Sequence, residues 1–323
     1  MSPIYQSEDA RRAVEQRYRA FLRRWPVPAT EATVPTRHGD TFVIVSGPRD
    51  GPPVVALHGG SFNSAAWTGD VATWAQTHRV YAVDVIGEPG LSAPSRPPLT
   101  SGSYADWLDD VLVAFDIGQA AFVGASLGGW LALDYAQRRP GRITRLALLV
   151  PGGIGRQRYG AVIGSLFLLP FGEWGRRAAV RLVLGPSPAT SDVTARSDVT
   201  ATSGVSATSG VSATSGVTAT SESAELADFL LLIQRSCRSR RNRLPIFSDD
   251  GLRRLAVPVL VVAGAKDRLL DSRQTARRVR RLLPHAAVVL LPGTGHIPIG
   301  YTGFVQRFLT GEDARVPDHP AGA

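Results

Sequence analysis

The stretch of residues 120–139, AAFVGASLGGWLALDYAQRR, combines a strand pattern, a glycine-flanked serine and a helix pattern. It opens on a continuous apolar run, AAFVGA, of the kind that forms a strand buried on both faces. From residue 127 onward, apolar side chains recur every three or four residues, which is the spacing of a helix. Between the two lies a G-x-S-x-G motif centred on Ser126, whose flanking glycines remove side chains that would collide in a tight turn. We therefore expect a strand, a sharp turn that lifts the Ser126 hydroxyl clear of the sheet, and a helix.

The same alternation of apolar runs and helical patterns extends over most of the chain. Helical spacing also appears over residues 104–115 and 272–283. The apolar runs that predict further buried strands are residues 54–58, 80–86, 145–150, 258–264 and 286–292. Strands that alternate with helices in this way are typical of a doubly wound α/β fold with a mostly parallel sheet. Residues 41–47, TFVIVSG, predict an additional antiparallel strand at the edge of that sheet.

The alternation stops between residues 152 and 248, where no strand-like run appears. We expect an inserted helical cap over 152–248, with the α/β core formed by residues 1–151 and 249–323. Within the insertion, a six-residue unit such as SGVSAT repeats over residues 191–220. These copies are too few to build the stacked turns of a β-helix, and one valine per unit cannot offset about 1–2 kcal/mol of backbone entropy per residue. We predict a flexible loop there.

Arginine supplies nearly all of the positive charge. The chain has 36 basic and 27 acidic residues, a net charge of +9, and Lys266 is its only lysine. Arginines cluster over residues 11–24, 235–243 and 268–281, where they could attract phosphate groups. Because apolar residues at helical spacing are interleaved with them, we interpret these clusters as solvated helix faces and expect no nucleic-acid partner.

The composition also bears on redox compartment and membranes. Cys237 is the only cysteine, so no internal disulfide can form, and no Cys/His cluster indicates a metal site. The N-terminal residues lack the apolar stretch of a secretory signal. The most apolar later run, residues 161–171, is far shorter than the ~20 residues that cross a bilayer. We expect a cytoplasmic protein that needs no metal or cofactor and has no membrane partner.

Two later loops supply what a reactive serine requires. A serine hydroxyl needs a base to take its proton and a third group to orient that base. Asp267 follows the apolar run 258–264, and His296 lies in a Gly-rich loop after the run 286–292. We expect Ser126 as the nucleophile, His296 as the base and Asp267 as the acid. Their order along the chain is serine, aspartate, histidine, which is the order found in α/β sheets with such a serine turn. Asp271 lies one helical turn after Asp267 and stays open as a competitor.

An acyl-transfer site also needs donors for the oxyanion. One is expected from the backbone N–H of Leu127, the residue after the nucleophile. The second is expected from the loop after residues 54–58, with Gly60 as the first choice and Ser61 as the second. We interpret His58 as a structural residue that braces this loop.

Together these features resemble the α/β-hydrolase superfamily. The segments LHGGSFNSAAW, YAVDVIGEPGLS, YADWLDDVL and VGASLGG are similar to those of bacterial carboxylesterases of the naproxen-esterase type. The resemblance is specific in the N-terminal half and generic beyond Pro151. It implies a serine esterase that cleaves small, largely apolar carboxylic esters through an acyl-enzyme. It also implies the triad Ser126, Asp267 and His296, with oxyanion donors on Gly60 and Leu127.

Other activities on the same fold stay open. Epoxide hydrolases and haloalkane dehalogenases have an aspartate where this chain has Ser126, which argues against both. Carbon–carbon bond hydrolases, lactonases and perhydrolases share the triad, and so does a ligand receptor that keeps it without turnover. The candidates for the substrate pocket are the aromatic residues Phe62, Trp67, Trp130, Phe167 and Trp174.

Overall fold

A computed structural model of the chain describes residues 4–158, 160–185, 215–238, 240 and 242–312. Eight strands form one sheet in the order β1-β2-β4-β3-β5-β6-β7-β8. The strands are β1 (Ala29–Val34), β2 (Thr41–Ser46), β3 (Pro53–Leu57), β4 (Arg79–Val83), β5 (Ala120–Ala125), β6 (Ile143–Leu149), β7 (Val259–Gly264) and β8 (Ala287–Leu291). Strand β2 runs antiparallel to both β1 and β4, and the six strands from β4 to β8 in the sheet are parallel. The expectation of a mostly parallel α/β sheet is confirmed.

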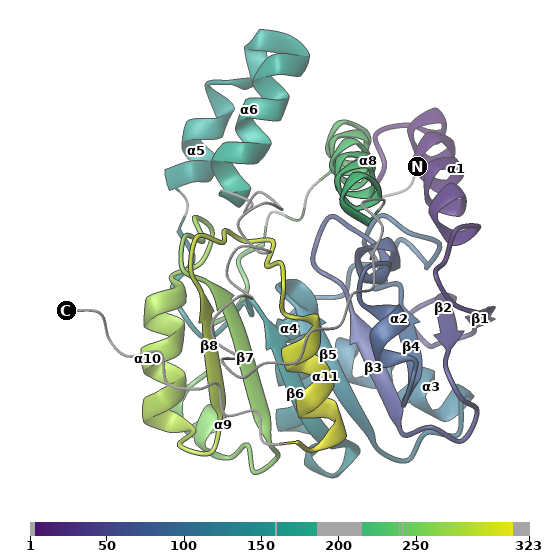
Figure 1. Cartoon of the computed structure of the whole chain (residues 1–323), viewed down its shortest axis with the longest axis vertical. Coiled ribbons are helices and arrows are strands. Elements are labelled where there is room, and N and C mark those ends of the chain that lie inside the picture. Colours follow the sequence, from purple (N-terminus) through teal and green to yellow (C-terminus); the bar gives the residue numbers. More distant parts are fainter. Residues whose placement is uncertain (1–3, 159, 186–214, 239, 241, 313–323) are drawn as a thin grey trace, which may run out of the picture.

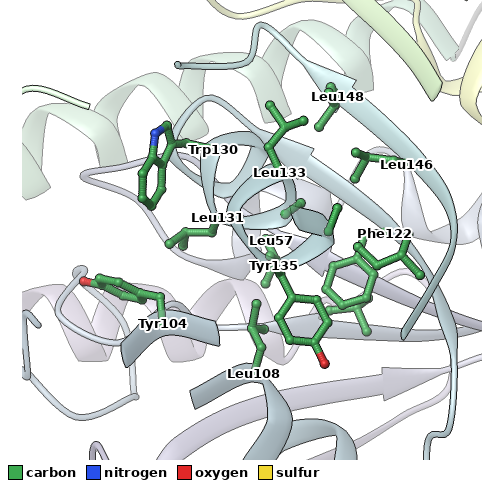
Figure 2. Close-up of a cluster of buried hydrophobic side chains, with 14 of the residues drawn as sticks. Leu57, Tyr104, Leu108, Phe122, Trp130, Leu131, Leu133, Tyr135, Leu146 and Leu148 are labelled. Atoms are coloured by element: carbon green, nitrogen blue, oxygen red, sulfur yellow. The ribbon is translucent and has the colours of Figure 1, made fainter. Parts of the chain in front are cut away.

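The central strands are apolar throughout because both faces of the sheet are covered. Along β5, Phe122 points into one hydrophobic cluster and Val123 into the other, on the opposite face. Figure 2 shows part of the first cluster, where the ring of Phe122 stacks on that of Tyr135 from the helix that follows β5. Trp130, Leu131 and Leu133 of the same helix also belong to this cluster. Alternation of this kind buries every second residue on each face.

Helices of the core divide between the two faces. Residues of α3 (Ser103–Ala114), α4 (Leu127–Arg138), α9 (Asp249–Arg253) and α10 (Ser272–Leu282) belong to the first cluster. Residues of α1 (Glu8–Leu22), α2 (Val71–Trp74), α11 (Thr302–Thr310) and the short 3₁₀ helix η1 (Ser64–Trp67) belong to the second. A second 3₁₀ turn, η2 (Pro140–Arg142), connects α4 to β6. The three helices predicted from periodicity are each found within one residue of the expected bounds.

One strand was not predicted, and this changes the edge of the sheet. Residues 41–47 do form an antiparallel strand, β2, but the expected edge position is wrong because β1 pairs with its outer side. Strand β1 reads ATEATV, and its first three residues are exposed. A strand with so few buried side chains has no apolar run by which a sequence could reveal it.

The segment between β6 and α9, predicted as an inserted cap over residues 152–248 and called the inserted segment below, contains several helices. They are α5 (Gly160–Leu166), the 3₁₀ turn η3 (Leu169–Phe171), α6 (Gly172–Leu184) and α8 (Ser215–Ser236). In Figure 1, α5 and α6 stand away from the sheet, whereas α8 lies beside α1. Repeat residues 191–214 lie outside the described residues. The last copy, residues 215–220, forms the first turns of α8, so the prediction of a loop is wrong for that copy.

The arginine clusters are only partly solvated. All six arginines over residues 11–24 are exposed or half-exposed, as expected for a solvated face. Arg278, however, donates to the backbone oxygens of Ile154 and Phe247 as well as to Asp249, and its side chain is 14% exposed. Arg240 is buried to a similar degree. For these two residues the interpretation as a solvated face is wrong. Each is largely buried and bonds to residues that are distant in the sequence.

Two absences bear on partners. None of the helices in the described part of the chain is long and apolar enough to cross a membrane. Among those same residues, no three metal-ligating side chains gather in one place.

Candidate active site

The turn between β5 and α4 holds Ser126 in a strained backbone conformation. Its φ is 49° and its ψ is −104°, a region that non-glycine residues rarely occupy. The two glycines of the motif are required because no side chain fits at either position. A Cβ on Gly124 would lie 2.5 Å from the carbonyl oxygen of Gly128, and a Cβ on Gly128 would lie 2.0 Å from that of Leu57. The turn can therefore bring the serine to the carboxyl edge of the sheet only with glycine at both positions.

Loops after β7 and β8 bring an aspartate and a histidine to this serine. The Nε2 atom of His296 lies 3.1 Å from the Oγ atom of Ser126, and its Nδ1 atom lies 2.8 Å from Oδ2 of Asp267. The Asp267 side chain is fully buried, and its Oδ1 atom accepts from the N–H groups of Leu269 and Leu270. With Nδ1–H donated to the carboxylate, Nε2 is free to accept the serine proton. The three predicted residues thus form one continuous hydrogen-bonded chain.

The same two loops are held together by their backbones. The N–H of Lys266 donates to the carbonyl oxygen of Thr294 over 2.8 Å. A Cβ on Gly264 would lie 2.1 Å from the carbonyl oxygen of Gly295. This close approach fixes the separation between Asp267 and His296.

Asp271 has a different task. Its side chain accepts from the N–H of Gln274 at the start of α10, at 3.0 Å, and pairs with Arg158 at 2.8 Å. Partial burial works to raise the pKa of Asp271, but the Gln274 N–H and the Arg158 guanidinium outweigh it and lower the pKa below its ordinary value. Asp267, and not Asp271, contacts the imidazole of His296.

The loop after β3 passes the serine on its other side. Gly60 and Leu127 both line the same pocket as Ser126, and a Cβ on Gly60 would lie 3.5 Å from the Leu127 side chain. Ser61 has a positive φ of 57°, and its N–H donates to Oε2 of Glu88 over 2.7 Å. The Ser61 N–H is therefore already engaged, which leaves the N–H groups of Gly60 and Leu127 as the candidate oxyanion donors.

His58 is buried beneath this loop and carries no solvent contact. Its Nε2 atom accepts from the N–H of Val85 over 2.9 Å, and its Nδ1 atom lies 2.8 Å from the carbonyl oxygen of Gly59. Desolvation lowers the pKa of His58 below its ordinary value. A neutral imidazole that accepts at Nε2 and donates at Nδ1 suits a bracing role between β3 and β4.

A cavity of about 450 Å³ opens beside Ser126 and His296. Phe62 and Trp67, two of the candidates for the substrate pocket, line it. Trp130 does not, because its indole N–H donates to the carbonyl oxygen of Pro245 and its ring stacks on Phe247. The other two candidates, Phe167 and Trp174 of the inserted segment, do not line the cavity. They are 76% and 69% exposed, respectively.

Several lining residues were not predicted from the sequence. Leu226 and Leu230 of α8 contribute apolar surface, and their four-residue spacing on a helix was the available signal. Polar lining comes from Gln157, Gln234, Arg240 and Asn242. No local motif marks these residues, because they meet only through the path of the inserted segment.

Known proteins with similar sequences share this architecture. A family model described as alpha/beta hydrolase fold matches residues 52–301. The carboxylesterase YbfK of Bacillus subtilis is 29% identical over 283 residues, which cover 87% of this chain and 86% of that protein. A second B. subtilis carboxylesterase, nap, is 28% identical over 303 residues, covering 92% of each chain.

A solved structure shows the same fold. The crystal structure of naproxen esterase from B. subtilis matches with a TM-score of 0.73 at 24% identity, covering 95% of this chain and 99% of that one. The resemblance expected from the N-terminal motifs is confirmed. The chain belongs to the α/β-hydrolase family.

Proposed function

We propose that this protein is a serine carboxylesterase that cleaves small, largely apolar esters. The observation that carries the proposal is the hydrogen-bonded chain from Ser126 through His296 to the buried Asp267. The carboxylesterases of B. subtilis that match most of the chain support the choice of ester substrates.

In the first half of the reaction, the Ser126 oxygen attacks the ester carbonyl carbon while His296 takes the serine proton at Nε2. The carbonyl oxygen becomes an oxyanion, which accepts from the N–H groups of Leu127 and Gly60. When the tetrahedral intermediate collapses, the bond to the alcohol oxygen breaks and His296 gives that oxygen its proton. The alcohol leaves, and the acyl group stays on Ser126.

In the second half, water replaces the alcohol. His296 takes a proton from the water as the water oxygen attacks the acyl carbon, and a second oxyanion forms at the same donors. Its collapse breaks the bond to Ser126 Oγ, which regains the proton from His296 and releases the carboxylic acid. The Asp267 carboxylate, which contacts Nδ1, stabilises the imidazolium in both halves.

The cavity supports the substrate class. Its apolar lining includes Phe62, Trp67, Leu149, Leu184, Leu226, Leu230, Leu270, Ile297 and Pro298. A volume of about 450 Å³ holds a small acyl group and alcohol but not a polymer. Apolar surface on this scale favours ester substrates with hydrocarbon substituents.

Hydrolysis of a chromogenic short-chain ester tests the proposal. We expect many turnovers per molecule of wild-type protein and a loss of about 10⁴- to 10⁶-fold in kcat for Ser126→Ala, because no other group can form the acyl-enzyme. A fluorophosphonate should label the wild type at Ser126 and leave the variant unlabelled. Equal hydrolysis by the two proteins would refute the proposal, and a single turnover followed by arrest would point instead to a receptor.

A further inference from the structure

Glu88 is a fully buried carboxylate beside the oxyanion loop, and the reaction described above does not use it. It lies in the segment after β4, and its side chain has no exposed surface. Its Oε2 atom accepts from the N–H of Ser61 over 2.7 Å. A carboxylate in such a place is costly unless donors or a counter-charge surround it.

The counter-charge comes from Arg240, which follows α8 in the inserted segment. Its Nε and one terminal nitrogen lie 3.2 and 3.1 Å from Oε1 of Glu88, and that nitrogen also donates to the hydroxyl of Tyr104 over 2.7 Å. The guanidinium also lies 5.7 Å from the centre of the Tyr104 ring, and the Arg240 side chain is 11% exposed. Glu88 is therefore bound on one oxygen by the oxyanion loop and on the other by the inserted segment.

The hydrogen bond from the Ser61 N–H to Glu88 restrains a strained part of the backbone. Ser61 occupies the left-handed region with a φ of 57°, which for a non-glycine residue persists only where the surroundings impose it. Gly60, one residue earlier, carries a candidate oxyanion donor. The hydrogen bond from the Ser61 N–H to Glu88 therefore restrains the peptide group next to the one that carries the Gly60 N–H.

We propose that Glu88 is the positioning residue of the oxyanion hole, and that Arg240 holds Glu88 in place when the inserted segment docks on the core. The inference rests on the proposed esterase function. It adds that the inserted segment, besides forming a wall of the pocket, completes the catalytic geometry through one buried ion pair. The oxyanion donor is then correctly aimed only while Arg240 stays paired with Glu88.

Two substitutions at Glu88 separate positioning from stability. Glu88→Gln and Glu88→Met both remove the charge that pairs with Arg240, but only glutamine keeps an oxygen that can accept from the Ser61 N–H. We expect Glu88→Met to lower kcat about 10- to 100-fold below Glu88→Gln, because a displaced oxyanion donor weakens transition-state binding. KM should stay within about threefold, since the pocket walls are unchanged.

Two inhibitors give a readout that a purely structural role would not move. A trifluoromethyl ketone forms a tetrahedral adduct with Ser126 and needs the oxyanion hole, whereas the matching secondary alcohol fills the pocket without forming an adduct. The inhibition constant of the ketone should rise in Glu88→Met in parallel with the fall in kcat. That of the alcohol should stay as in Glu88→Gln.

Arg240 gives an independent test if Glu88→Met does not fold. Arg240→Met should lower kcat and raise the inhibition constant of the ketone more than Arg240→Lys, which keeps a positive charge near Glu88. Asp110→Asn is the control, because it breaks an exposed ion pair with Arg37 far from the pocket and should leave both constants unchanged. The melting temperature of each variant is measured alongside.

The outcomes distinguish this inference from the proposed function. Equal kcat and equal ketone affinity in Glu88→Gln and Glu88→Met, or in Arg240→Lys and Arg240→Met, would overturn the inference while the Ser126-dependent turnover of the wild type stands. A parallel loss of alcohol affinity in Glu88→Met would also overturn it, because the pocket as a whole would then have changed. Absence of Ser126-dependent turnover in the wild type would overturn the esterase proposal and the inference with it.

Discussion

His296 can accept the proton of Ser126 only if its ring is held with Nε2 toward the serine. Asp267 holds it so, through the 2.8 Å contact to Nδ1. The buried carboxylate in turn is oriented by the N–H groups of Leu269 and Leu270. An asparagine at position 267 would retain the shape but favour the wrong tautomer of the imidazole.

We therefore expect Asp267→Asn to lower kcat by about 10³- to 10⁴-fold. Asp271→Asn is the matched control. It keeps an oxygen for the Gln274 N–H, loses a half-exposed pair with Arg158 at the pocket lining, and should lower kcat far less than Asp267→Asn does. Steady-state kinetics of the two variants check this, and the opposite ranking would show that the acid has been assigned to the wrong aspartate.

At the scale of elements, α8 joins the pocket to the N-terminal helix. Phe229 of α8 is fully buried, with its ring centre 5.2 Å from that of Phe21 and 5.7 Å from that of Phe62. The ring centre of Tyr18 in α1 lies 6.4 Å from that of Phe229, and the Tyr18 hydroxyl donates to Oδ1 of Asp84 over 2.8 Å. Because Phe62 lines the cavity, the packing of α8 against α1 shapes the substrate site.

Phe229→Ala should therefore lower the free energy of unfolding by about 3–5 kcal/mol, the usual cost of removing a buried aromatic ring. It should also raise KM, because Phe62 loses the ring that supports it. Phe167→Ala, in the same inserted segment but 76% exposed, should change both by little. Urea denaturation and ester kinetics on the pair measure the two effects, and similar losses in both would contradict the role given to α8.

Over the whole molecule, one buried acid ties the first part of the core to its last helix. Asp70 accepts from the hydroxyl groups of Tyr301 and Thr302 at the start of α11, and it is 5% exposed. Desolvation, opposed by these two hydrogen bonds, raises the pKa of Asp70 from 3.8 to about 6. In the unfolded chain the group ionises near pH 4, whereas in the folded protein it keeps its proton until about pH 6.

The contribution of Asp70 to stability is therefore full below about pH 4 and is lost as the pH rises to about 6. Asp70→Asn cannot ionise. We expect the free energy of unfolding of the wild type, minus that of Asp70→Asn, to fall by on the order of 2–3 kcal/mol over this range and to stay constant above it. Denaturation of both proteins at a series of pH values measures the difference, and a flat difference would contradict the raised pKa.

The fold could be predicted from the sequence because its central strands are apolar on both faces, as in the runs around Phe122 and Val261. Ser126, Asp267 and His296 could be placed for a related reason, since each follows such a run at the same edge of the sheet. Glu88 and Arg240 could not, because they lie 152 residues apart and no periodicity links them. Trp130 was misplaced because a position one turn after the serine does not reveal which side of α4 faces the pocket.

The backbone pairing of the N-terminal segment with the end of α8 sets an order of events during synthesis. The N–H of Gln6 donates to the carbonyl oxygen of Ser236, and that of Arg238 donates to the carbonyl oxygen of Ile4. During synthesis, Ile4 and Gln6 must therefore wait for some 230 further residues before their partners exist. Since His296, the proposed base, is synthesised later still, we expect a nascent chain to gain hydrolytic activity only after both partners of this backbone pairing exist.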